Sequence, residues 1–211
     1  MANPDARFGL KPVRHIDGSP WNGATMRCYV SASYATALYI GDPVDIDTTL
    51  SQRVAGIKCP TVIRSAFTDG TYVVGVITSF EPNPDNLTQQ YRPGSQARYC
   101  NVCVDPTVVF QVRDDGGVVL AVVTIGQNAV GIFTHAGSTI TGLSGMELDS
   151  GTTTAPSADA SNTMIIIGAA EDDTNTWDGT VDTRVVWEVM LCNWRFLGPC
   201  SPYGQLGVTA T

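Results

Sequence analysis

Two of the six cysteines have the spacing of a metal or redox motif, Cys100-Asn-Val-Cys103. A zinc site of this type needs further ligands, but neither His15 nor His135 stands at zinc-finger spacing from the pair, and the sequence has no second CxxC. The motif lies in the run 96–104, which has the composition of a strand. Because residues three apart on a strand point to opposite faces, these thiols could not easily share one metal. The pattern predicts buried structural cysteines and no metal site.

A single Asp-Ser-Gly triplet at 149–151 matches the signature of aspartic proteases. Those enzymes need two carboxylates that share a proton, from two copies of the motif or from a dimer. In a stretch rich in Gly, Ser and Thr, the triplet predicts an Asx turn instead. The segment 142–145 lacks the spacing of a nucleophile elbow, and the chain has no glycine-rich phosphate loop. We therefore expect a protein that is not an enzyme and has no cofactor.

The composition indicates one domain with a mostly uncharged polar surface. Of the 211 residues, 43% are hydrophobic and only 15% are charged, against about 25% charged in typical domains. The net charge of −8 argues against nucleic-acid binding, which needs a basic face. No apolar run approaches the ~20 residues of a membrane span, and no apolar segment of the signal-peptide type follows the first charges. The sequence predicts a protein made in the cytoplasm, without nucleic-acid or membrane partners.

The charge is distributed unevenly along the chain. Residues 114–183 hold ten acidic side chains and no lysine or arginine, whereas the first 27 residues hold four basic and two acidic side chains. Such asymmetry can set orientation and partner choice in an assembly. The alternative is chance clustering on a polar surface.

Short runs rich in β-branched and aromatic residues alternate with turn signals, and no window shows a long helical period. About eight short strands of this kind predict an all-β single domain, a barrel or a sandwich. A hairpin is expected where 61–67 and 71–80 flank Thr-Asp-Gly. The run 183–197 is apolar on both faces, which is typical of a central strand or of a strand covered by another subunit. The other expected strands are 25–30, 35–40, 44–47, 96–104, 107–113 and 163–170, with 118–126 as a strand or a short helix.

The chain divides into an arm, a domain and a tail. Residues 1–24 are rich in turn, aromatic and basic residues and contain no strand-like run, so we expect an extended arm that does not fold by itself. The β domain is expected over 25–197, and a C-terminal tail over 198–211. Long polar loops on a β scaffold commonly present contacts, and the alternative is that they are simply solvated. Two such loops are expected at 150–163 and 170–180.

Blocks spread over nearly the whole chain form a recognisable pattern. It opens with FGLKPVRH at 8–15 and GSPWNG at 18–23. It continues with ALYIGDPV at 37–44, GVITSFEP at 75–82, QYRP at 90–93, TGLSGMELDS at 141–150 and WEV at 187–189. Together these blocks resemble the head decoration, or cement, proteins of tailed bacteriophages.

The resemblance implies a mostly β, non-enzymatic virion protein on the outer surface of an icosahedral capsid. Such a protein bridges neighbouring major capsid proteins and holds them against DNA pressure, often as a dimer or trimer. An arm that cannot bury its own aromatic residues would then bury them on a neighbour, the alternative being that it packs back on its own domain. The expected capsid or partner contacts are Phe8, Lys11, Arg14, Trp21, Trp177 and Trp194.

A second hypothesis is a phage tail or fibre protein, a β-sandwich that binds a host-surface glycan. Exposed aromatic residues around a groove would favour glycan binding. Aromatic residues buried at contacts with other chains would favour a cement.

Overall fold

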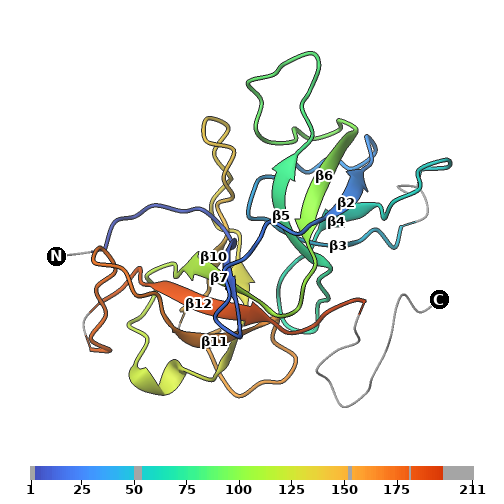
Figure 1. The fold of residues 1–211 in the computed structure, drawn as a ribbon. Helices are drawn as coiled ribbons and strands as arrows, with labels where there is room; N and C mark the ends of the chain where they lie inside the picture. Colours follow the sequence, from blue (N-terminus) through green and yellow to red (C-terminus); the bar gives the residue numbers. More distant parts are fainter. Residues whose placement is uncertain (1–2, 50–53, 152–153, 181, 197–211) are drawn as a thin grey trace.

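The computed structural model describes residues 3–49, 54–151, 154–180 and 182–196, and these form an all-β protein (Figure 1). Twelve strands and one short 3-10 turn are assigned in the described ranges, which confirms the predicted all-β single domain. The number of strands exceeds the expected eight because three of them are only two residues long and another lies within 1–24, where no strand was expected. The described residues contain no helix with the length and apolar character needed to span a bilayer. The predicted tail, 198–211, lies outside the described residues.

The first sheet is antiparallel and has the strand order β1-β7-β12-β11-β8. In β12, Trp187 and Val189 are fully buried on one face, whereas Val186 and Glu188 are half-buried on the other. The prediction of a central strand in 183–197 is therefore confirmed, and its second face stays partly open. The strands are β1 (Lys11–His15), β7 (Val108–Arg113), β12 (Val186–Leu191), β11 (Met164–Ala169) and β8 (Asn128–Ala129).

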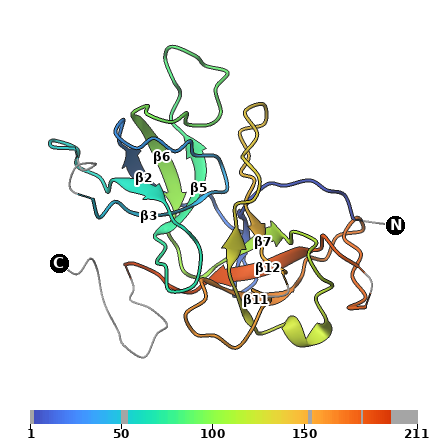
Figure 2. The same cartoon turned by 180° about the vertical axis from the view of Figure 1, so that it is seen from behind.

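The second sheet has the order β2-β6-β5-β3-β4 and curls into a small barrel. A parallel bridge between Tyr29 and Thr61 brings its two edges together. Figures 1 and 2 show this sheet beside the first one, with the two-stranded pair β9 and β10 next to the first sheet. The strands are β2 (Met26–Val30), β6 (Arg98–Cys103), β5 (Gly75–Phe80), β3 (Pro43–Ile46), β4 (Val62–Arg64), β9 (Gly131–Ile132) and β10 (Glu147–Leu148).

The expected hairpin of 61–67 with 71–80 is wrong, because β3 lies between β4 and β5 and pairs with both. Phe67 is the physical reason for the different pairing. Its side chain is fully buried and its backbone adopts a φ of 56°, while its carbonyl accepts the N–H of Gly131. The connection is therefore anchored to β9 and leaves the plane of the sheet before a tight turn can form.

Two further runs also differ from the expected strands. The run 35–40 makes only isolated bridges, from Leu38 to Arg92 and from Ile40 to Leu143. The run 118–126 contains the 3-10 turn Val122–Thr124, with Val123 74% exposed. No described strand pairs with either run, so β-branched composition alone does not produce a strand there.

Two apolar clusters fill the molecule. The main core lies between the sheets and contains Phe110, Trp187 and, from the second sheet, Cys103. The barrel core lies inside the second sheet and contains Cys28 and Cys100, which stand directly opposite each other on β2 and β6. Cys100 and Cys103 thus face different cores, as their spacing on a strand predicts. Burial raises the pKa of Cys28 to about 12 and that of Cys103 to about 11, so these thiols are poor nucleophiles.

The prediction that residues 1–24 contain no strand is wrong. β1 lies within this segment and pairs with β7, at the edge of the first sheet. Its sequence signal is weak because it includes Pro12 and a register shift between Pro12 and Arg14. The preceding residue, Leu10, is only 1% exposed and belongs to the main core. The arm therefore packs back on its own domain, the alternative that the sequence left open.

We expect the substitution Leu10→Ala to lower the free energy of unfolding by about 2–5 kcal/mol, because it leaves a cavity in the main core. Leu87→Ala is the matched control, since Leu87 is 78% exposed and its loss should change stability by less than about 0.5 kcal/mol. Urea unfolding followed by near-UV circular dichroism measures both values. Equal stabilities for the two variants would show that the N-terminal segment does not belong to the core.

Candidate functional site

A groove of about 640 Å³ lies beside β1, β7 and β12, at the partly open second face of the first sheet. Apolar side chains from distant parts of the chain line much of it. Polar side chains from β1, β5, β7 and the loop after β11 complete the lining. The lining residues are Phe8, Leu10, Lys11, Pro12, Trp21, Ile40, Ile77, Thr78, Gln111, Arg113, Leu143, Ala170, Asp172, Thr174, Asn175 and Val186.

Three of the six predicted contact residues meet in this groove, namely Phe8, Lys11 and Trp21. Phe8 and Trp21 are half-buried, and Lys11 is exposed. Arg14 lies on the same strand as Lys11 and forms an ion pair of 2.6 Å with Glu188 of β12. The residues before, within and after β1 thus supply one wall of the groove.

The two tryptophans predicted near the C-terminal end are placed differently. Trp194 is 4% exposed and its indole N–H donates to the carbonyl of Leu191, so this expected contact residue is corrected to a core residue. Trp177 is half-buried, with its ring edge-to-face against Trp187 at 5.1 Å and its indole N–H bonded to the carbonyl of Leu120. Most of its polar and apolar surface is used within the chain, and its role in a contact stays a prediction.

The groove depends on a close crossing of three chain segments. A Cβ atom on Gly9 would lie 2.6 Å from Cβ of Ser144, and one on Gly41 would lie 2.6 Å from the carbonyl oxygen of Phe8. Both glycines have positive φ, 69° and 93°, so any other residue would be strained as well as crowded. Leu10 then donates its N–H to the carbonyl of Gly41 at 3.0 Å. The crossing places Phe8 and Leu10 next to the segments that carry the rest of the apolar lining.

Asp42 holds two of these segments together. Its carboxylate is 1% exposed, accepts the hydroxyl of Ser144 at 2.5 Å and accepts the N–H of Tyr39 at 2.9 Å. Burial raises the pKa of Asp42 to about 6. The two hydrogen bonds act to lower this pKa, but their effect is smaller than that of burial. Asp42 has no catalytic or binding motif around it in the sequence, although the Gly-Asp-Pro turn signal marks the place.

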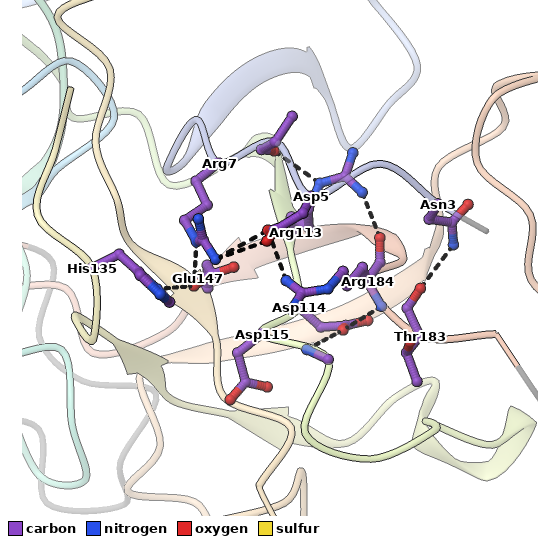
Figure 3. Close-up of polar contacts among 12 residues, drawn as sticks. Asn3, Asp5, Arg7, Arg113, Asp114, Asp115, His135, Glu147, Thr183 and Arg184 are labelled. Atoms are coloured by element: carbon purple, nitrogen blue, oxygen red, sulfur yellow. Dashed lines mark hydrogen bonds and ion pairs between the residues drawn. The ribbon is translucent and has the colours of Figure 1, made fainter.

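Polar contacts fix the residues that precede Phe8 in the chain (Figure 3). We call this group of residues the N-terminal clasp; it consists of Asp5, Arg7, Arg113, Glu147 and Arg184. Arg7 Nε lies 3.0 Å from Oε2 of the buried Glu147, although the pair is not aligned as a hydrogen bond. Asp5 pairs with Arg184 at 2.7 Å. Arg113 donates to the carbonyls of Ala6 and Arg184. Residues 5–7 are thereby held on the first sheet, which fixes the position of Phe8.

Two further contacts extend the clasp. His135 Nδ1 lies 3.0 Å from the same Oε2 of Glu147, and Asn3 donates to the carbonyl of Thr183 at 3.0 Å. The other carboxylate oxygen of Glu147 is buried without a hydrogen-bond partner among the described residues. Sequence reasoning missed the clasp, and the one visible signal was a charged residue at 147 between Met146 and Leu148.

The Asp-Ser-Gly triplet, which the sequence offered as a catalytic motif, has a structural role. Asp149 Oδ1 accepts the N–H of Gly151 at 2.8 Å, which confirms the predicted Asx turn. A search of the described residues for clusters of three or more histidine, cysteine or carboxylate ligands finds none. The arrangement of the groove fits binding of another molecule better than acid–base or nucleophilic chemistry.

Comparison with protein-family models, with curated proteins and with solved structures finds no match to this chain. The resemblance to bacteriophage decoration proteins therefore stays a prediction.

We expect Asp42 to make stability depend on pH. Its pKa is about 6 in the folded protein and about 3.8 when unfolded, so the folded state binds this proton more tightly. The resulting stabilisation is complete below about pH 4 and is lost as pH rises through about 6. The unfolding free energy of the wild type minus that of Asp42→Asn should fall by on the order of 2 kcal/mol over that interval. Urea titrations across this pH range measure the difference, and a flat or rising difference would contradict the assignment.

Proposed function

We propose that the protein is a non-enzymatic structural protein of a bacteriophage virion, which binds the outer surface of the capsid and cements neighbouring major capsid proteins. The groove is the observation that carries this proposal. It offers half-buried aromatic rings and aliphatic side chains on a fixed scaffold, where a neighbouring protein could complete the cover of the first sheet. The resemblance of the sequence blocks gives the type of partner.

Two projecting loops each carry one exposed apolar side chain. The loop between β5 and β6 and the long connection between β9 and β10 extend to the same side of the molecule in both views (Figures 1 and 2). Their tips carry Leu87 and Ile140, which are 78% and 89% exposed. The loops are adjacent, because a Cβ on Gly142 would lie 2.7 Å from Cβ of Gln90. These two side chains are accessible to another surface.

The alternative of glycan binding is favoured by the aromatic residues that line the groove, Phe8 and Trp21. A sugar also needs free hydrogen-bonding groups for its hydroxyls. Asp172 already accepts both the N–H and the hydroxyl of Thr174, and the side-chain amide of Asn175 already bonds to Ala170 and Val186. These two side chains are therefore engaged within the chain, and the mainly apolar lining makes a protein partner the better proposal.

A cement stabilises a shell because it binds the assembled capsid and has little affinity for released subunits. Each site then contributes RT ln(1 + [L]/Kd), about 2.7 kcal/mol at a hundredfold excess over Kd. A capsid presents many equivalent sites, so modest binding at each site adds up over the particle. Binding as a dimer or trimer would place copies at local symmetry axes.

We expect DNA-filled heads that lack this protein to release their DNA at a lower temperature than decorated heads. Adding the purified protein back should restore the higher temperature, because binding favours the intact shell. A fluorescent DNA dye followed during heating measures the release. Equal release temperatures with and without bound protein would contradict the cement proposal.

The variants Phe8→Ala and Val123→Ala link this effect to the groove. Phe8 lines the groove, whereas Val123 is 74% exposed and does not line it. Phe8→Ala should weaken decoration at least fivefold, and Val123→Ala should leave it unchanged. A glycan array probed with the same proteins tests the alternative, and specific binding there without decoration of heads would favour it.

A further inference from the structure

The polar groups of the groove differ in how well they are satisfied. The indole N–H of Trp21 is buried and has no hydrogen-bond acceptor among the described residues. Lys11 is exposed and makes no hydrogen bond or ion pair within the described part of the chain, and its charge is felt by Asp172 only through space. The carboxylate of Asp172, in contrast, already accepts two hydrogen bonds from Thr174. Of these three groups, the two without a hydrogen-bond partner are donors.

The charges of the lining residues also favour an anionic partner. Two of the lining residues are basic, Lys11 and Arg113, and one is acidic, Asp172, although the whole chain has a net charge of −8. Arg113 is 7% exposed and its donors bond to backbone carbonyls, so the accessible cation of the groove is Lys11. An anionic group that enters along β1 meets a positive charge at a place where most of the molecule would repel it.

We infer that the groove binds an extended segment of a partner protein that carries one carboxylate among apolar residues. The carboxylate lies at the ammonium of Lys11, and the apolar side chains pack on the half-buried Phe8, Ile40 and Leu143. Trp21 is only partly buried, and a turn of its ring toward the segment brings its N–H to a backbone carbonyl. A buried donor without an acceptor destabilises the free protein, so the new hydrogen bond favours the bound state. The inference rests on the proposed function only in taking the partner to be a protein.

A second copy of this chain is a poorer occupant. Its acidic loop would bring Glu171, Asp172 and Asp173 as adjacent carboxylates. The same loop already borders the groove through Asp172, so the two loops would repel each other. A segment with a single carboxylate that is aimed at Lys11 avoids most of this repulsion.

The test uses three blocked pentapeptides that differ only at the second position. Their sequence is leucine, then glutamate, glutamine or lysine, then valine, threonine and leucine. Fluorescence anisotropy of dye-labelled peptides should give at least fivefold tighter binding for the glutamate peptide than for the glutamine peptide, and weaker binding still for the lysine peptide. Salt at 0.5 M should reduce the preference for glutamate, because screening weakens the exposed ion pair.

Two variants locate the contact. Lys11→Met should remove the preference for glutamate over glutamine, whereas Lys58→Met should retain it, because Lys58 is exposed and does not line the groove. Binding should also change the intrinsic tryptophan fluorescence, and Trp21→Phe should abolish that change. Equal binding of the three peptides, no binding up to millimolar concentration, or an unchanged preference in Lys11→Met would overturn the inference.

The outcomes separate this inference from the cement proposal. If the wild type and the Lys11→Met variant decorate heads equally well and the wild type does not bind the peptides, the cement proposal stands and the inference is overturned. Protein that prefers the glutamate peptide but does not change DNA release leaves the inference standing and removes the cement proposal. Self-association in sedimentation velocity that Lys11→Glu abolishes would make a second copy the occupant and overturn the assignment of a different partner.

Discussion

The close approach of Gly9 to Gly41 and Ser144 is the constraint on which the groove depends. No side chain larger than hydrogen fits at either glycine, because a Cβ there would lie 2.6 Å from Ser144 or from the carbonyl of Phe8. The crossing brings together residues of three segments that are distant in the sequence, 8–10, 40–41 and 142–144. Leu10 then enters the main core, β1 joins the first sheet, and Phe8 is left on the wall of the groove. The clasp around Arg7 and Glu147 stabilises the same arrangement from the N-terminal side.

Much of the fold could be predicted from local pattern, but the pairing of strands could not. Runs rich in β-branched and aromatic residues identify β12 and β6, and the two-residue period of a strand places Cys100 and Cys103 on opposite faces. The expected hairpin failed because Phe67 is held by contacts with a residue more than sixty positions later, Gly131. β1 was missed because its pairing with β7 joins residues about one hundred positions apart and its own sequence contains a proline. Such long-range pairings leave no periodic signal in a short window.

The site was predictable only in part, for a related reason. Phe8, Lys11 and Trp21 are conspicuous because a turn-rich segment with aromatic and basic residues has no evident place in a core. Their neighbours in the groove, such as Ile77 and Leu143, look like ordinary strand or loop residues until the fold brings them together. Trp194 shows the converse error, because a conspicuous aromatic residue was assigned to a contact and instead fills the core. Residue type identifies candidates, and only the tertiary arrangement distinguishes a contact from core packing.

Because the N-terminal segment is ordered in the free protein, binding of a partner does not need to order it. A disordered arm would lose conformational entropy when it docked, of the order of 1–2 kcal/mol for each backbone residue that became fixed. Here residues 3–15 are already held by the clasp, by Leu10 and by the pairing of β1 with β7, so this entropy is lost when the protein folds. A partner then meets a preformed surface, and most of its contact energy can appear as affinity. On this fixed surface, the ammonium of Lys11 and the indole N–H of Trp21 remain without hydrogen-bond acceptors, and a partner can supply them.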